Sequence, residues 1–200
     1  MNANQMNTGR GYWLAWFSAS IIGYILGAVL GVSVAERLFD RSPFHVVMGL
    51  ALGTVMGATA GYFQWVVLRE RVAGAGLWTL ASALGFGLAM AIDTGENYAM
   101  AGVLLGSVFG VVGGILQWLI LRRKVARAGW WLLANILGSL VGAISILIAV
   151  PIGEAGNWGL AIITFGLVFG AGNGAITGGA LVWLLRQSYT GYIEDLATAN

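Results

Sequence analysis

A ladder of four glycines, spaced four residues apart, occurs three times in this 200-residue chain. About thirty residues before each ladder stands a segment of the form Trp-x-x-Ala-[Ser/Asn]-x-x-Gly-x-x-x-[Gly/Ala]. Both patterns have the spacing of one α-helix face, and self-similarity at a fixed period is typical of repeat architectures. We therefore predict a chain built from pairs of helices. The Trp segments begin at Trp16, Trp78 and Trp131, and the ladders are Gly49, Gly53, Gly57 and Gly61; Gly102, Gly106, Gly110 and Gly114; and Gly166, Gly170, Gly174 and Gly178.

The composition places these helices in a membrane. Hydrophobic residues make up 58% of the chain and charged residues only 9%, against about 25% charged residues in an average soluble domain. Most of the uncharged apolar stretches reach the roughly 20 residues that a helix needs to cross a bilayer. The third stretch is the shortest, and it gains length if residues 72–76 join it. We predict an all-α polytopic membrane protein with six transmembrane helices, at residues 12–34, 46–68, 77–92, 98–121, 130–150 and 158–185.

The six helices form three two-helix repeats within a single integral-membrane domain that covers residues 1–200. Each repeat crosses the membrane twice, so successive copies enter it in the same direction and are related by rotation about the membrane normal. The repeats cover approximately residues 12–69, 77–122 and 130–186, with tails at 1–11 and 187–200.

The first two ladders continue into the same polar ending, Gln64-Trp65-x-x-Leu68-Arg69 and Gln117-Trp118-x-x-Leu121-Arg122. With this ending, the ladder resembles that of a loose group of uncharacterised bacterial multispanning proteins built from similar hairpins. The resemblance covers nearly the whole chain and implies no activity. Mitochondrial carriers also have three two-helix repeats, but the chain lacks their Pro-x-[Asp/Glu]-x-x-[Lys/Arg] signature.

The few charged residues predict an orientation. Eight of the ten basic residues flank one end of the predicted spans, and five of the eight acidic residues flank the other. The positive-inside rule then places both termini in the cytoplasm, in a bacterial inner membrane. This topology explains the small excess of basic over acidic residues, and we expect no nucleic-acid partner.

The first apolar stretch could also be a signal peptide cut after Ser33-Val34-Ala35. However, it is longer than the usual signal-peptide core of about 7–15 residues. It also carries the same Trp-x-x-Ala-Ser-x-x-Gly pattern as later segments. We therefore interpret it as the first transmembrane helix.

The glycine ladders predict close helix packing. Without side chains, two helix backbones can approach and gain dispersion contacts, which drive helix association in lipid. The alternative is that the grooves line a pore or seat a flat ligand such as a pigment, a quinone or a lipid tail.

Several polar side chains fall inside the apolar stretches. We favour interhelical hydrogen bonding for Gln64, Gln117 and Asn135, with substrate contact as the alternative. Asn173 and Thr177, four residues apart in the last stretch, are the first choice for a polar site within the membrane.

Tryptophan and basic residues gather near the predicted cytoplasmic ends of the spans. Indoles prefer the headgroup layer, so an anchoring belt is favoured over a ligand cage. The basic residues are ordinary topology determinants or contacts for anionic lipid headgroups. The tryptophans are Trp13, Trp16, Trp65, Trp78, Trp118, Trp130, Trp131 and Trp183, and the basic residues are Arg69, Arg71, Arg122, Arg123, Lys124 and Arg127.

Residues typical of catalysis or metal binding are scarce. The chain has no cysteine, one histidine and no acidic residue inside a predicted span. His45 could ligate a chlorin or haem, but we favour a solvated or helix-end role. Asp93 and Glu96 in one short turn could bind a cation weakly, and we favour a solvated turn. We expect no enzyme activity, no cofactor and no metal.

Two functions remain open. The first is a structural or accessory six-helix bundle that packs through glycine-lined faces with a copy of itself or with a larger membrane complex. It predicts a tightly packed interior and an exposed groove of small residues. The second is a small transporter or channel with a path between the three repeats. A continuous polar cavity reaching Asn173 would favour transport.

Overall fold

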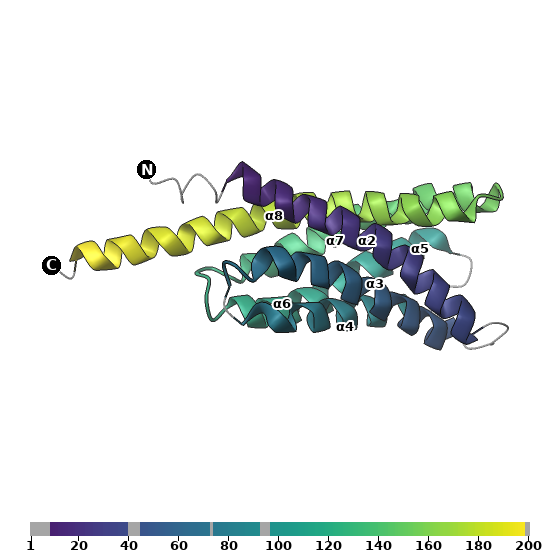
Figure 1. Cartoon of the computed structure of the whole chain (residues 1–200), viewed down its shortest axis with the longest axis horizontal. Helices are drawn as coiled ribbons and strands as arrows, with labels where there is room; N and C mark the ends of the chain where they lie inside the picture. The colour runs from purple at the N-terminus through teal and green to yellow at the C-terminus, as the bar shows by residue number, and fades with distance from the viewer. Residues whose placement is uncertain (1–8, 40–44, 73, 93–96, 199–200) are drawn as a thin grey trace.

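The computed structural model describes residues 9–39, 45–72, 74–92 and 97–198. Within these ranges every regular element is a helix (Figure 1). The elements α5, η2 and α6 are continuous, and η2 is a π-helical segment within that rod. The elements are α2 (Arg10–Phe39), α3 (His45–Leu68), η1 (Ala75–Leu77), α4 (Trp78–Met90), α5 (Tyr98–Val108), η2 (Phe109–Gly113), α6 (Gly114–Leu121), α7 (Trp130–Glu154) and α8 (Trp158–Thr198).

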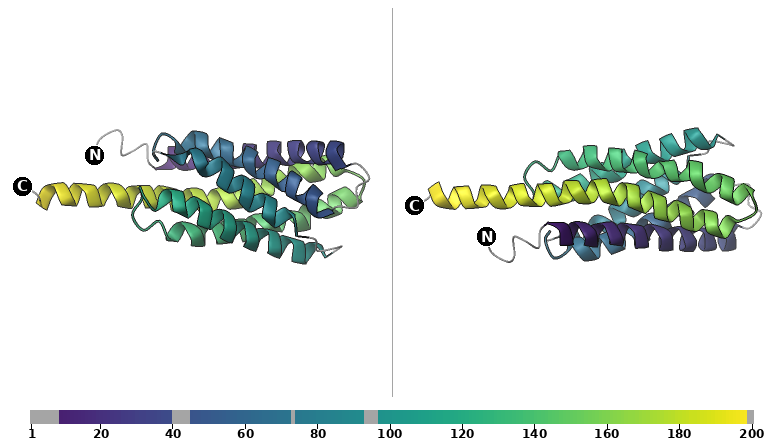
Figure 2. Two further views of the ribbon diagram at one scale, coloured as in Figure 1. Left: turned by 90° about the horizontal axis from the view of Figure 1, so that it is seen from below. Right: turned by 90° about the horizontal axis from the view of Figure 1, so that it is seen from above.

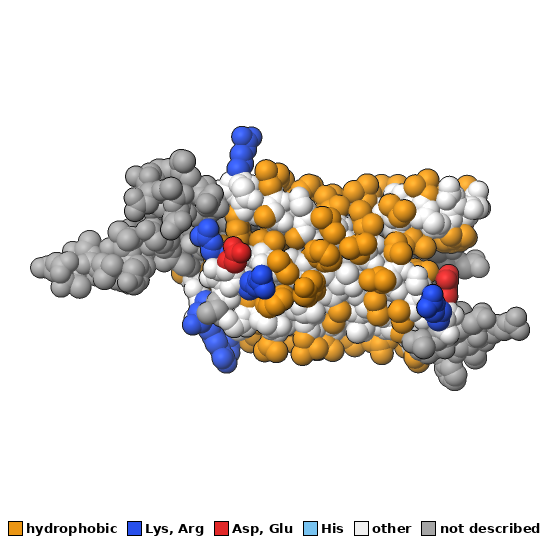
Figure 3. Space-filling view, viewed as in Figure 1, with side chains coloured by type: hydrophobic (Ala, Val, Ile, Leu, Met, Phe, Trp, Pro, Cys, Tyr) orange, Lys and Arg blue, Asp and Glu red, His pale blue; other side chains and the backbone are white. Residues whose placement is uncertain are grey.

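Five helices of the described part are long and apolar enough to cross a membrane, by length and composition. A shorter apolar helix covers Ala75–Met90. Large aliphatic side chains such as Leu80 and Leu147 point outward, while polar ones such as Gln117 are buried. Hydrophobic side chains cover the middle of the bundle, and most Lys and Arg side chains on the visible face lie at one end (Figure 3). The chain is therefore an all-helical integral membrane protein. The bounds of these helices are Arg10–Arg37, Val46–Leu68, Met100–Leu121, Trp130–Glu154 and Trp158–Gln187.

The helices form a closed ring in chain order. α2 packs against α3, α3 against α4, and α4 against the α5–η2–α6 rod; that rod packs against α7, and α7 against α8. α8 then packs against α2, which closes the ring (Figure 2). α2 begins and α8 ends on the same side of the bundle.

Each glycine ladder packs against the helix that follows it around the ring. A Cβ added at Gly53 would lie 2.5 Å from the Phe86 carbonyl oxygen, and one at Gly106 would lie 2.9 Å from the Leu140 Cα. Gly170 closes the ring in the same way, because its Cβ would lie 2.7 Å from the Ile21 Cα. The first ladder meets α4, the second meets α7 and the third meets α2.

Glycines of the preceding Trp segments make the other contacts around the ring. A Cβ at Gly27 would lie 2.8 Å from the Met56 carbonyl oxygen, and one at Gly142 would lie 3.0 Å from that of Phe169. We call α2 and α3 the first hairpin, α4 and the α5–η2–α6 rod the second, and α7 and α8 the third. The contacts of Gly27 and Gly142 join the two helices of one hairpin, whereas the ladders join neighbouring hairpins. Eleven of the twelve ladder glycines are buried and Gly49 is half-buried. The expected exposed groove of small residues therefore does not lie along the ladders.

Several segment boundaries differ from the sequence prediction. Of the described residues proposed to lengthen the third span, only Ala75 and Gly76 continue α4, as part of η1, because Gly74 before them has a φ of 83°, in the left-handed region. The 13 residues of α4 rise only about 20 Å. At the other end, α8 continues as a helix beyond Arg186 to Thr198, through most of the segment predicted as a tail.

Candidate functional site

Three indoles meet at the centre of the ring. Trp16, Trp78 and Trp131 come from the corresponding position of the first helix in each hairpin, and each is at most 1% exposed. Their ring centroids are 5.3 to 6.0 Å apart, in edge-on arrangements. These arrangements suit the quadrupole of aromatic rings. We call these three residues the indole triad.

The predicted anchoring role is wrong for the three triad tryptophans. In the segment Trp16-x-x-x-Ser20-x-x-Gly23, the indole shares a helix face with small residues, and that face packs inward. The remaining members of the predicted group stay exposed or half-buried, and for them anchoring remains a prediction. They are Trp13, Trp65, Trp118, Trp130 and Trp183.

A set of buried polar side chains lies one helical turn from the triad. Gln64 Nε2 donates to Ser20 Oγ at 3.1 Å. Gln64 Oε1 accepts from Trp78 Nε1, also at 3.1 Å. The amide of α3 therefore links α2 to α4, and it fixes the Trp78 ring in the triad.

The second hairpin repeats this arrangement and extends it. Gln117 Nε2 donates to Ser82 Oγ at 3.0 Å, while its Oε1 accepts from Trp131 Nε1 at 3.1 Å and from Asn135 Nδ2 at 2.5 Å. Ser82 Oγ in turn donates to the Trp78 carbonyl oxygen at 3.0 Å within α4, and the bond from Trp78 Nε1 to Gln64 joins this set to the first hairpin.

The third hairpin reaches the same result with different residues. Leu181 occupies the position of the glutamines, and Thr177 Oγ1 accepts from Trp16 Nε1 at 3.0 Å instead. Thr177 donates to the Asn173 carbonyl oxygen at 2.7 Å. Asn173 Nδ2 donates to Ser139 Oγ at 3.2 Å, and Ser139 donates to Asn135 Oδ1 at 3.3 Å.

These bonds connect into one network that starts on α2 and returns to it. The five residues predicted from the sequence as a possible polar membrane site, Gln64, Gln117, Asn135, Asn173 and Thr177, all belong to it. We call the network the polar belt; its other members are Ser20, Ser82, Ser139 and the three triad indoles.

The polar belt satisfies its own hydrogen bonds. Among the described residues, Ser145 Oγ is the one buried side-chain polar atom that has no partner, and it lies outside the belt. The belt consists of amides, hydroxyls and indoles, which stay neutral across the physiological pH range. Its chemistry is therefore helix-to-helix hydrogen bonding, without a group that could take up a proton.

Aromatic rings fill the axis on the other side of the belt. Tyr24, Phe86, Phe109 and Phe169 are buried, and neighbouring ring centroids are 4.8 to 6.2 Å apart. Beyond them is an apolar cavity of about 230 Å³. It is lined by Ala28, Met56, Phe165 and other apolar side chains. The aromatic layer lies between this cavity and the belt.

The predicted basic residues lie in the connections after α3 and α6. Three of them stack on aromatic rings: Arg69 over Trp65 at 5.3 Å, Arg71 over Tyr12 at 5.8 Å and Arg122 over Trp118 at 5.2 Å. Arg123 and Lys124 line a groove beside α4. Arg127, with a φ of 55°, lies next to Trp130 in a shallow depression.

The structure adds no support for the candidate metal or haem ligands from the sequence. His45 begins α3, but its side chain lies outside the described residues, as do Asp93 and Glu96. Across the described ranges, no group of three or more His, Cys, Asp or Glu residues could hold a metal ion.

We predict that Gln117→Leu destabilises the protein more than Gln64→Leu, because Gln117 bonds to three buried partners and Gln64 to two. At about 0.6 kcal/mol per hydrogen bond, plus the cost of stranded partners, the expected losses are about 2–3 and 1–2 kcal/mol. Unfolding in detergent measures both. Equal losses, or none, would contradict the assignment of these bonds.

No family model matches the chain, and no solved structure matches it. The chain is similar to the Na(+)/H(+) antiporter NhaA 1 of Pseudomonas putida, with 30% identity over 133 residues. The match covers 56% of this chain and 34% of the antiporter, so the chain spans about a third of the length of that curated relative.

Proposed function

We propose that this protein is a non-enzymatic structural or accessory bundle of a bacterial inner membrane, with six crossings and both termini in the cytoplasm. The bias of basic residues supports this orientation. So does the position of the start of α2 and the end of α8 on one side of the ring. In this cysteine-free chain, Asn157→Cys should react with an impermeant maleimide in intact cells, whereas Ala126→Cys should react only after permeabilisation.

The observation that carries the structural role is the occupied centre of the ring. The indole triad, the polar belt and the aromatic layer follow one another along the axis, and the belt satisfies its own hydrogen bonds. Such an interior suits a rigid body better than a conduit. Since the ladders are buried between hairpins, a second copy or a larger complex would dock on the lipid-facing aliphatic surface.

The alternative is a small transporter or channel, and the similarity to the antiporter favours it. A path between the hairpins would have to separate the triad and break belt hydrogen bonds. The six apolar stretches also contain no charged residue, whereas transporters that move protons usually carry ionisable groups within the membrane. We therefore prefer the structural role.

Two measurements separate the two functions. Native mass spectrometry after gentle extraction from the source membrane should recover the protein in a homo-oligomer or a larger complex. Proteoliposomes with a sodium gradient and an internal pH dye should behave like empty liposomes. A sodium-driven pH change that Gln117→Leu abolishes would overturn the structural proposal and establish transport through the belt.

A further inference from the structure

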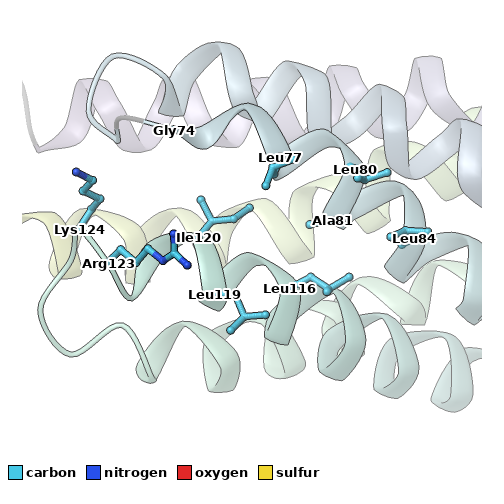
Figure 4. A pocket seen from close by; sticks show the side chains of 10 residues that line it. All are labelled: Gly74, Leu77, Leu80, Ala81, Leu84, Leu116, Leu119, Ile120, Arg123 and Lys124. Carbon is cyan, nitrogen blue, oxygen red and sulfur yellow. The ribbon is translucent and has the colours of Figure 1, made fainter.

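A groove of about 600 Å³ runs between α4 and α6 on the lipid-facing side of the second hairpin. Leu77, Leu80 and Leu84 line one wall, and Leu116, Leu119 and Ile120 line the other (Figure 4). Arg123 and Lys124 lie at one end of the groove, near the turn that contains Gly74. The groove is therefore apolar along its length and cationic at one end.

The two cations at this end are available to a ligand. Arg123 and Lys124 are exposed. Neither side chain makes an ion pair, hydrogen bond or ring contact with any residue that the structure describes. Their neighbour Arg122 differs, since its guanidinium lies over Trp118. In Figure 4 the Arg123 side chain turns back along the groove beside Ile120.

The first hairpin differs from the second in its cations and in the spacing of its two helices. In the sequence register that aligns Gln64 with Gln117, Arg123 corresponds to Glu70, and Lys124 corresponds to Arg71. Arg71 is engaged over Tyr12 at 5.8 Å. The helices α2 and α3 also approach closely along Gly23, Gly27 and Gly31, whose added Cβ atoms would lie within 2.8 Å of α3 backbone atoms.

In the second hairpin, Gly85 stands at the position of Gly23, and a Cβ added there would lie 2.7 Å from the Gly113 Cα. At the position of Gly27, however, this hairpin has Ala89. The groove lies on the other side of the Gly85 contact from Ala89, towards the start of α4 and the two cations that follow α6. None of the ladder glycines of this hairpin lines the groove, so the groove does not follow from the ladder.

We propose that this groove binds one anionic phospholipid. The phosphate and a second negative or hydroxyl-rich headgroup lie between Arg123 and Lys124, and one acyl chain follows the leucines between α4 and α6. The leucine walls match a hydrocarbon chain, and cationic groups at the membrane surface attract anionic headgroups. A zwitterionic lipid fills the same walls but carries no net charge for the two cations.

The test is native mass spectrometry of the purified full chain titrated with palmitoyl-oleoyl phosphatidylglycerol or with the matching phosphatidylcholine. We expect one tightly held phosphatidylglycerol, bound about tenfold more tightly than phosphatidylcholine. The double variant Arg123→Gln/Lys124→Gln should remove this preference. The matched control Arg69→Gln/Arg71→Gln, which removes the same charge from the first hairpin, should retain it.

Further arms test the apolar part and the source of the phosphate. Leu119→Trp, which places a larger side chain in the groove wall, should weaken binding of both lipids. Millimolar inorganic phosphate should not displace phosphatidylglycerol, because it has no acyl chain. Circular dichroism checks that every variant is folded. Equal affinity for the two lipids, an equal loss in both double variants, or displacement by phosphate alone would overturn the proposal.

Discussion

Replacing Gly57 with leucine is expected to abolish the folded, monodisperse protein in detergent. Gly57 belongs to the first ladder, and a Cβ there would collide with the Ser82 carbonyl oxygen and would lie 2.8 Å from the Phe86 Cβ. The clash involves the backbone of α4, which no side-chain rotation relieves. Overpacking costs about 1–3 kcal/mol in ordinary cores, and a leucine against a facing backbone belongs at or above the upper end.

The chain supplies a matched control for this substitution. Gly159 lies in α8, is exposed and has nothing within 4 Å of an added Cβ. Gly159→Leu should therefore give the same elution profile and melting temperature as the wild type. If Gly57→Leu and Gly159→Leu melted together, the ladder would not be a helix-packing surface.

Alanine substitutions in the ladders should destabilise the protein to different extents, depending on how close the facing helix is. At Gly102 the nearest atom to an added Cβ is the Ala143 carbonyl oxygen at 3.3 Å, so a small shift accommodates a methyl group. Alanine also gains about 1 kcal/mol of helix propensity over glycine. Gly102→Ala should be close to neutral, while Gly57→Ala should lower the melting temperature.

Replacing Trp131 with alanine is expected to cost about 3–5 kcal/mol of unfolding free energy, the usual loss when a large buried aromatic side chain is truncated. The Trp131 ring is 1% exposed and contacts both other triad indoles. Truncation leaves a hole on the axis of the ring, and it also strands part of the Gln117 amide in the polar belt.

The neighbouring residue is the control. Trp130 is 57% exposed, and its ring centroid is 6.3 Å from that of Trp183. Trp130→Ala should change the unfolding free energy by less than about 1 kcal/mol. Trp131→Phe keeps most of the ring but loses the N–H donor, so its loss should fall between the two. Thermal or denaturant unfolding in detergent measures all three, and similar losses for Trp130→Ala and Trp131→Ala would contradict the triad's structural role.

Helix periodicity contains more information about the interior than composition alone suggests. Trp16, Ser20 and Gly23 lie on one helix face, and the same holds around Trp78 and Trp131. Since glycine marks a face that meets another helix, the sequence contained a signal that these indoles point inward. The headgroup preference of tryptophan obscured that signal, although it remains the interpretation for Trp65 and Trp118.

Other parts of the site had no local signal. Trp16 and Thr177 are 161 residues apart, and their hydrogen bond exists only because α8 packs against α2. Leu181 stands at the glutamine position of the last helix, and nothing in the sequence identifies Thr177 as the replacement acceptor. The groove beside Arg123 and Lys124 likewise depends on how far α4 and α6 separate.

The sequence by itself determined the helical, membrane-embedded character of the chain and the helix faces that carry glycine. It could do so because helix periodicity and the absence of charge act within one segment. Only the tertiary structure decided which glycine face meets which helix, because three similar ladders offer several compatible partners. Closing the ring between α8 and α2 then decided that the polar belt returns to its starting helix.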